Sequence, residues 1–142
     1  MGKGTEIKFG YLGGGKTSIP VKMAASQSAN INNKSGKFVY IDSGQAKMNA
    51  DGITEILGWI EASSEVTYAA NDQVNCIVDS NARFRIPVNS GTFTADMVGK
   101  TCDISISSNI QGAQLDASAE DTIYIVDGDL DDNDWVEVGE FC

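Results

Sequence analysis

The sequence predicts an all-β protein, a small β-barrel, sandwich or tulip-like body with an extended N-terminal arm. Three observations predict it. Many short segments alternate apolar and polar residues with the strand period, turn-forming residues separate these segments at close intervals, and almost no segment follows the helical period. The 142 residues suit one domain with its own hydrophobic core, and we find no internal repeat.

The N-terminal segment, residues 1–36, differs from the rest of the chain. It is rich in Gly, Ser, Asn and Lys, and it contains the turn-prone runs Gly13–Gly15 and Asn30–Asn33. Its apolar residues follow no sustained period outside a short predicted strand at Glu6–Phe9. We therefore predict two parts, an extended basic arm over residues 1–36 and an acidic β-rich body over residues 37–142. Deletion of the arm is then expected to leave a folded body.

The first half of the body is expected to hold five strands. They are predicted at Phe38–Ile41, Ile53–Ala62, Val66–Tyr68, Gln73–Val78 and Ala82–Val88. Turn chemistry at Asn49–Gly52 precedes the most apolar of these segments, in which Gly58 predicts a β-bulge. In the last strand, apolar residues alternate with Arg83 and Arg85, which predicts one buried and one wet face.

The second half of the body continues the same pattern. Residues 94–99 predict one helical turn that begins at an N-cap Thr94 and ends at Gly99. Further strands are predicted at Cys102–Ser107, Thr122–Val126 and Trp135–Phe141. The last two of them are joined by a strongly acidic loop.

Charge is divided unevenly along the chain, whose formal net charge is −10. Residues 1–48 hold seven lysines and two acids, 7 − 2 = +5, whereas the remainder holds three bases and 18 acids, 3 − 18 = −15. Overall acidity argues against binding a nucleic-acid backbone. A basic segment on an acidic body can instead attract a neighbouring copy or fold back on its own body, and charge alone favours neither.

The residue inventory excludes several kinds of catalytic site. The chain has no histidine, so serine–histidine and cysteine–histidine nucleophile pairs are ruled out. The cysteines Cys76, Cys102 and Cys142 are widely spaced and match no disulfide framework or zinc site, which predicts thiols in a reducing cytosol. No apolar run is long enough to span a membrane. We expect a protein that is not an enzyme and carries no cofactor.

Gly10–Thr17 matches the P-loop pattern of nucleotide hydrolases. In such a site Lys16 would contact the terminal phosphates and Thr17 a magnesium ion, and a helix would follow. Pro20 and the stretch Ala24–Asn33, which lacks an amphipathic period, argue against that helix. We interpret the segment as a glycine-rich arm and keep a nucleotide hydrolase as an alternative.

The acidic loop at residues 127–134 resembles a calcium-binding loop in its spacing of oxygen ligands. Started at Asp129, it places Asp131, Asn133 and Glu140 at ligand positions. The glycine that such a loop needs at its sixth position is replaced by Asp134, and the flanks read as strands. The alternatives are therefore a weak cation site or a solvated acidic loop.

Three stretches resemble the head decoration, or cement, proteins of tailed bacteriophages. They are Asp51–Glu61, Pro87–Asp103 and Thr122–Asp129 with the acidic turn after it. The resemblance implies a β-rich body with an arm that clamps neighbouring capsid subunits, often as a trimer at local threefold positions. It also implies a location on the capsid surface of a virion assembled in the host cytoplasm, with the major capsid protein and copies of the chain as partners.

We therefore expect a capsid-stabilising structural protein that binds by strand addition and lysine contacts, with neither nucleic acid nor membrane as partner. The predicted partner-binding residues all lie in the arm: Lys3, Lys8, Phe9, Tyr11, Lys16 and Lys22. The alternatives are another virion component, such as a neck or fibre accessory protein, and a calcium-dependent protein-binding module that uses the acidic loop.

Overall fold

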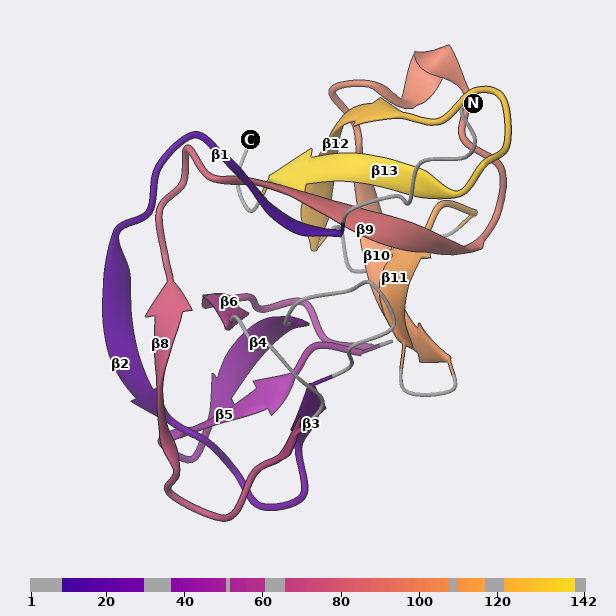
Figure 1. The fold of residues 1–142 in the computed structure, drawn as a ribbon. Coiled ribbons are helices and arrows are strands. Elements are labelled where there is room, and N and C mark those ends of the chain that lie inside the picture. Colours follow the sequence, from indigo (N-terminus) through magenta and orange to yellow (C-terminus); the bar gives the residue numbers. More distant parts are fainter. Residues whose placement is uncertain are drawn as a thin grey trace.

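A computed structural model describes residues 9–29, 37–50, 52–60, 66–107, 110–116 and 122–139 (Figure 1). The strands are β1 (Gly10–Gly13), β2 (Ser18–Lys22), β3 (Ser28–Ala29), β4 (Lys37–Asp42), β5 (Gln45–Met48), β6 (Gly58–Ile60), β7 (Val66–Thr67), β8 (Gln73–Ile77), β9 (Arg83–Ser90), β10 (Thr101–Ser107), β11 (Ile110–Gln114), β12 (Ile123–Gly128) and β13 (Trp135–Gly139). One 3₁₀ turn, η1 (Ala95–Met97), is the only helical element among the described residues. The all-β prediction is confirmed.

Strands β1 and β9–β13 form the first of two sheet units, which we call the large unit. Strand β9 pairs with β11 on one edge and with β13 on the other. Strand β10 pairs with both β11 and β12, and β12 pairs with β13, so the ladder returns to β9 and closes a five-stranded barrel. Strand β1 adds to β9 beside this ring. Closure leaves the barrel without a free sheet edge along most of its circumference.

Strands β2, β4, β5, β6 and β8 form the small unit, in the order β2-β8-β6-β4-β5. Its two outer strands meet at one end, where Met23 bridges Ala46 and the amide of Ala24 donates to the carbonyl of Ala46 at 3.0 Å. This contact curls the sheet around its own apolar side chains. The two-residue strands β3 and β7 pair separately.

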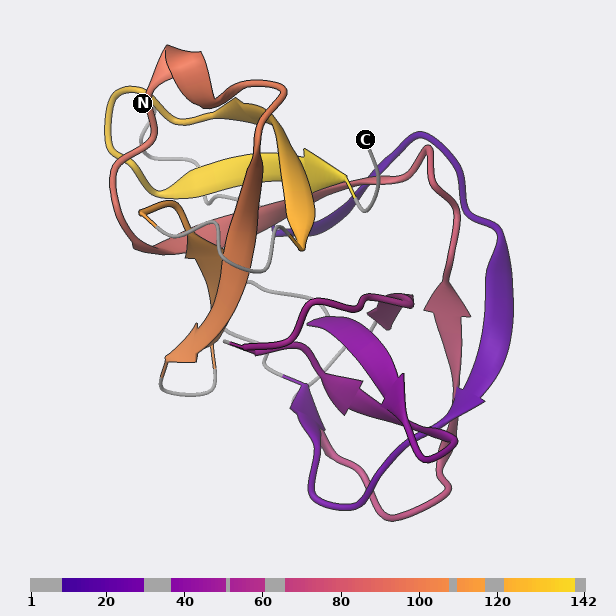
Figure 2. The same ribbon diagram turned by 180° about the vertical axis from the view of Figure 1, so that it is seen from behind.

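The small unit is inserted into the large unit between β1 and β9. The chain leaves the large unit after β1 and returns to it just before β9 (Figures 1 and 2). The two crossing segments run side by side, because β1 pairs with β9 on one side of them and β2 pairs with β8 on the other. Residues 14–17 and 78–82 therefore form a double link between the units.

The barrel core extends into the small unit through a cluster of aromatic rings. Phe38 of β4 and Trp59 of β6 both pack on Phe84 of β9, with ring centroids 5.1 and 4.9 Å away. These rings belong to one buried cluster with the interior of the barrel. A second buried cluster, which includes Met23 and Ile60, fills the small unit alone. The two units thus share one core, and the small unit has another of its own.

A buried glutamine also joins the two units through backbone hydrogen bonds. The side-chain carbonyl of Gln111 on β11 accepts the amide of Phe38 at 2.8 Å, and its NH₂ group donates to the carbonyls of Phe38 and Asn49 at 2.9 Å each. Buried polar groups that lack partners are costly, so this side chain ties β4 firmly to the barrel.

The arm predicted for residues 1–36 is extended, but its described part is not separate from the body. Strand β1 pairs with β9, and β2 pairs with β8 along its whole length. Val21, Met23 and Ala24 are buried in the small unit. The predicted boundary at residue 36 is therefore wrong for residues 9–29, because these strands find their partners 51 to 75 residues away. Lys3, Lys8, most of the strand predicted at Glu6–Phe9 and residues 30–36 lie outside the described residues.

Most strands predicted in the body are confirmed, with one exception at the most apolar segment. Only Gly58–Ile60 of the predicted strand Ile53–Ala62 is a strand, and its register shows no bulge. Gly58 is required for another reason, since a Cβ there would meet the carbonyl oxygen of Ile77. The predicted turn at 94–99 is present as η1, and Gly99 follows it with φ +87°.

The short strands β1 and β3 were not predicted from the sequence, and neither were β2, β5 and β11. The segments of the last three, SIPVK, QAKM and IQGAQ, are short and contain Pro, Gly or several polar residues. Such segments have low intrinsic strand preference. They become strands because each meets a partner that satisfies its backbone.

Candidate partner-binding surface

The glycine-rich segment that matches a P-loop encloses a carboxylate of its own chain. The amide and the hydroxyl of Thr17 both donate to Oδ2 of Asp79, at 3.3 and 3.0 Å. A Cβ at Gly15 would collide with the same carboxylate. Strand β2 follows, where a P-loop has a helix. An acid therefore lies where phosphate would need to bind, and the alternative of a nucleotide site is not supported.

The hydrogen bonds at this carboxylate also change its acidity. The amide of Asn81 donates to Oδ1 of Asp79 at 2.9 Å. This bond and those from Thr17 stabilise the charged form, so they hold the pKa of Asp79 below its usual value. The charged carboxylate thereby ties residue 17 of the first crossing segment to residues 79–81 of the second.

The described members of the predicted partner-binding set take different positions. Tyr11 is half-buried, and its ring meets that of Phe84 edge-on at 5.9 Å. Phe9 is half-buried as well. Lys16 is exposed, with its ammonium nitrogen 5.1 Å from the centre of the Tyr11 ring. Lys22 is exposed at the end of β2. Tyr11 thus contributes to its own core, and the two lysines flank β2 at the surface.

Strand β2 is an edge of the small unit, and its hydrogen-bond register shows which groups face outward. The carbonyl of Thr17 accepts the amide of Val78, and the amide of Met23 donates to the carbonyl of Asp72. Bonds to β8 alternate along an antiparallel pair, so the odd-numbered residues 17–23 face β8. The peptide groups of Ser18, Pro20 and Lys22 consequently point away from it, and that of Lys22 faces β5, where Met23 bridges Ala46. Pro20, which has no amide hydrogen, occupies an outward position, as prolines in edge strands do.

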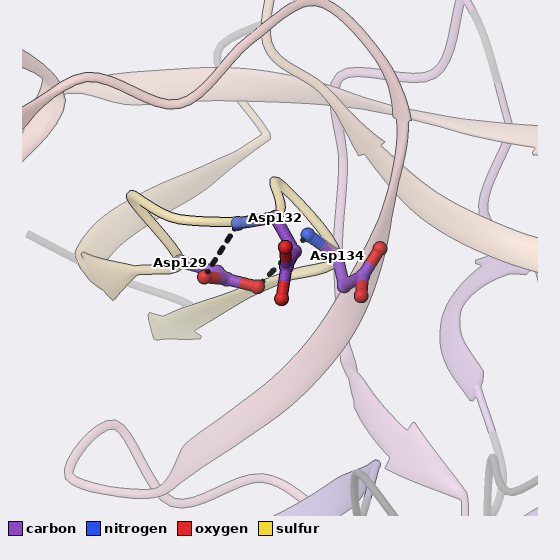
Figure 3. Close-up of side chains that lie close together, drawn as sticks. All are labelled: Asp129, Asp132 and Asp134. Atoms are coloured by element: carbon purple, nitrogen blue, oxygen red, sulfur yellow. Dashed lines mark hydrogen bonds between the residues drawn. The ribbon is translucent and has the colours of Figure 1, made fainter. Parts of the chain in front are cut away.

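The acidic loop between β12 and β13 is organised around one aspartate (Figure 3). Oδ1 of Asp129 accepts the amides of Asp131 and Asp132 at 3.1 Å each, and Oδ2 accepts the amide of Asp134 at 3.2 Å. Carboxylate oxygens of Asp129, Asp132 and Asp134 lie within 4.8 Å of one another. The spacing is one that a divalent cation can bridge. The backbone bonds to Asp129 account for the shape of the loop without an ion.

The ligand set predicted for this loop differs from the cluster that the structure forms. Asp131 is exposed outside the cluster, and Glu140 lies outside the described residues. Asn133 has φ +58°, and its side chain turns toward the loop before η1. There it accepts the amide of Phe93 at 2.7 Å and donates to the carbonyl of Gly91 at 2.8 Å. Asn133 therefore holds two loops together and is not placed as a ligand with Asp129.

Both arginines of the chain lie on the outer face of the barrel, against aromatic rings. The guanidinium carbon of Arg85 is 4.1 Å from the centre of the Trp135 ring, and that of Arg83 is 5.4 Å from the Tyr124 ring. Nη1 of Arg83 donates to the carbonyls of Asn81 and Ala82 at 3.1 Å. The buried face predicted for β9 is therefore confirmed, and its other face, predicted to be wet, is half-buried beneath aromatic rings of β12 and β13. The sequence signal for this surface was the alternation at residues 83–88 alone.

No protein-family model matches the chain, and no curated protein is similar to it. In the part of the chain that the structure describes, no helix has the length and apolar character that crossing a membrane requires. Function is therefore inferred from the surfaces described above.

Proposed function

We propose that this chain is a structural virion protein that binds the outer surface of a tailed-phage capsid and stabilises it, acting by contact with other subunits and not by catalysis. One observation carries the proposal: the start of β2, away from its contact with β5, presents the outward-facing peptide groups of Ser18 and Pro20, and exposed lysines, Lys16 and Lys22, flank the strand on a chain of net charge −10. An exposed strand edge is a template for a strand of another protein.

The position of the stretches that resemble decoration proteins supports this proposal. The hydroxyl of Thr122 donates to the carbonyl of Ile53 at 3.0 Å, and Cys102 pairs with Ile123 across β10 and β12. Side chains from all three stretches lie in, or pack against, the cluster that the two units share. The resemblance thus covers the common core, and the edge of β2 is where the chain can contact a partner.

Strand addition also gives the proposal its energetic logic. A peptide strand can gain backbone hydrogen bonds from Ser18 and from the carbonyl of Pro20, and the lysines add charge contacts at both ends of β2. Each interface of this size is weak, at a few kcal/mol, but many copies on one shell act together. The sum of these weak contacts over a whole shell is what a stabilising protein needs in order to make the shell resist rupture.

A binding assay with purified shells of the phage that encodes the chain tests the proposal. Wild-type protein is expected to sediment with the shells and to raise the temperature at which they rupture. The double variant Lys16→Glu/Lys22→Glu should bind at least about tenfold more weakly, because it reverses both flanking charges. Lys100→Glu, at another exposed lysine, serves as the matched control and should bind like the wild type.

Three results would contradict the proposal. Wild-type protein that leaves the shells unbound removes the capsid as the partner. Electron microscopy of labelled virions that shows label only at the neck, tail or one vertex favours another virion component. Equal binding by the lysine variant and the control shows that the edge of β2 is not the contact.

A further inference from the structure

We propose that the outer face of β9, β13 and β12 binds the same face of a second copy in a two-fold arrangement, in which the acidic loop of each copy lies against Arg83 and Arg85 of the other. This inference goes beyond the proposed function, which concerns binding to the capsid, because it concerns contact between copies of the chain. It adds the surface, the symmetry and the residues of that contact.

The alternation of buried residues along the strands shows which side chains point outward on this face. Phe84 and Ile86 on β9 and Val136 and Val138 on β13 are buried, so the residues between them point outward. The outward residues are Arg83, Arg85 and Pro87 on β9, Trp135 and Glu137 on β13, and Tyr124 on β12. Trp, Tyr and Arg are the residues that most often dominate the energy of protein interfaces.

The two arginines lack acceptors for several of their donors within the described chain. Nε of Arg85 has no hydrogen-bond partner but is covered by its own chain, so a carboxylate of a second copy would pair with the Nη groups of this half-buried side chain. The described residues also provide no acceptor for the remaining donors of Arg83 beyond its two carbonyl bonds. The aromatic rings hold both guanidinium groups in place, so little side-chain freedom is lost when a carboxylate binds. Planar guanidinium groups pair with carboxylates through two parallel bonds.

Charge on this face runs from negative at one end to positive at the other. The hairpin loop at the start of β13 carries five carboxylates between Asp127 and Asp134. Arg85 lies opposite Glu137 in the middle of β13, and Tyr124, which Arg83 covers, lies opposite Gly139 at its far end. Counting Glu137, the arginine region has a charge of 2 − 1 = +1, against −5 for the loop.

A face with this polarity is complementary to itself after a half-turn. A two-fold axis through its centre, perpendicular to the strands, places the loop of each copy on the arginines of the other, and the contact occurs twice. The spacing permits it, since β13 is about 15 Å long at roughly 3.3 Å per residue. The same net charge of −10 on both copies opposes association, but at physiological salt the Debye length of about 8 Å leaves the close pairs dominant.

A charge exchange measured by sedimentation velocity tests the inference on the full chain, with no capsid present. Wild-type protein at high micromolar concentration and physiological salt is expected to be a dimer. Arg83→Glu/Arg85→Glu and Asp131→Lys/Asp132→Lys should each weaken that dimer by at least about tenfold. A mixture of the two variants should form a one-to-one dimer again, because each loop then meets an opposite charge. The aspartate variant leaves Asp129 in place, so the loop keeps its backbone bonds.

The controls separate this contact from general charge effects and from misfolding. The aspartate variant lowers the net charge from −10 to −6, so long-range repulsion alone predicts tighter self-association, the opposite of our expectation. Recovery of the dimer in the mixture shows that both variants are folded. Lys100→Glu, at an exposed lysine that is not among the outward residues of this face, should dimerise like the wild type.

The inference is overturned by a wild-type monomer, by a trimer, or by variants that dimerise unchanged. None of these results touches the proposed function, because capsid binding is measured separately and depends on Lys16 and Lys22. Conversely, a wild-type dimer that fails to bind shells overturns the proposed function and does not affect the inference about this interface.

Discussion

Both units of this protein close through backbone pairing between strands. They differ in the extent of that pairing and in the size of the buried cluster that stabilises each. The large unit is a continuous ladder that returns to β9, and its interior shares a buried cluster with Phe38, Trp59 and Ile77 of its neighbour. The small unit curls around a smaller cluster, and its ends meet only near Met23 and Ala46. The difference indicates that the small unit depends on the large one for part of its stability.

The largest expected effect comes from the ring that both units share. Phe84→Ala removes a fully buried side chain that contacts Phe38, Trp59 and Tyr11, and we expect it to lower the free energy of unfolding by about 3–5 kcal/mol. Urea denaturation followed by circular dichroism measures this loss. Hydrogen exchange should show faster opening in both units.

Phe93→Ala is the matched control for that substitution. Phe93 is buried against Gly128, within the large unit. Its loss should speed exchange in β9–β13 more than in the small unit. If Phe84→Ala and Phe93→Ala give the same exchange pattern, the aromatic cluster does not couple the stability of one unit to that of the other.

A second, somewhat smaller effect is expected from the core of the small unit. Met23 is fully buried where β2 meets β5, so Met23→Ala should cost about 2–5 kcal/mol locally. Amide exchange should rise in β2, β5 and β8 while β10–β13 keep their protection. Met97→Ala, at a half-buried methionine in the large unit, is the control and should leave the small unit unchanged. Uniform loss of protection in both units after Met23→Ala would contradict a weaker small unit.

The smallest expected effect concerns the double link between the units and depends on pH. Hydrogen bonds from Asn81 and Thr17 lower the pKa of Asp79 from its usual 3.8, so the charged form stabilises the folded state. That contribution is complete above pH 3.8 and is lost as the pH falls through the lower, folded-state pKa. Melting curves of wild type and Asp79→Asn should therefore differ at neutral pH and converge in acid. A difference that stays constant down to pH 2 would show that the charge of Asp79 is not what links the segments.

The sequence-based predictions succeeded where the information is local and failed where it comes from residues distant in the chain. Alternation of apolar residues correctly predicted β9, β10 and the start of β13, because period two reports directly which face of a strand is buried, and β12 was predicted from its strongly apolar run. Alternation failed for Ser18–Lys22, where Pro20 and exposed residues hide the strand. A consequence is that deletion of residues 1–36, expected to leave a folded body, removes β1, β2 and the buried Met23.

The candidate binding surfaces likewise have some features that the sequence shows and others that only the fold creates. The basic residues around β2 and the acidity of residues 127–134 are visible in the sequence, since charge needs no folding to be counted. The edge of β2, the role of Asn133 and the stacking of Arg85 on Trp135 are not, because each depends on a neighbour distant in the chain. Asn133, for example, bonds to a residue 40 positions earlier.

The sequence by itself determined that this chain is a β protein with an acidic body, no histidine chemistry and buried faces on most of its strands. Only the tertiary structure decided that residues 10–22 belong to two sheets, that one unit is inserted into the other, and that the arginines share a face with the acidic loop. The physical reason is that burial leaves a local period in the sequence. The choice of strand partner depends on backbone hydrogen bonds, which every residue except proline can both donate and accept and which therefore leave almost no local trace.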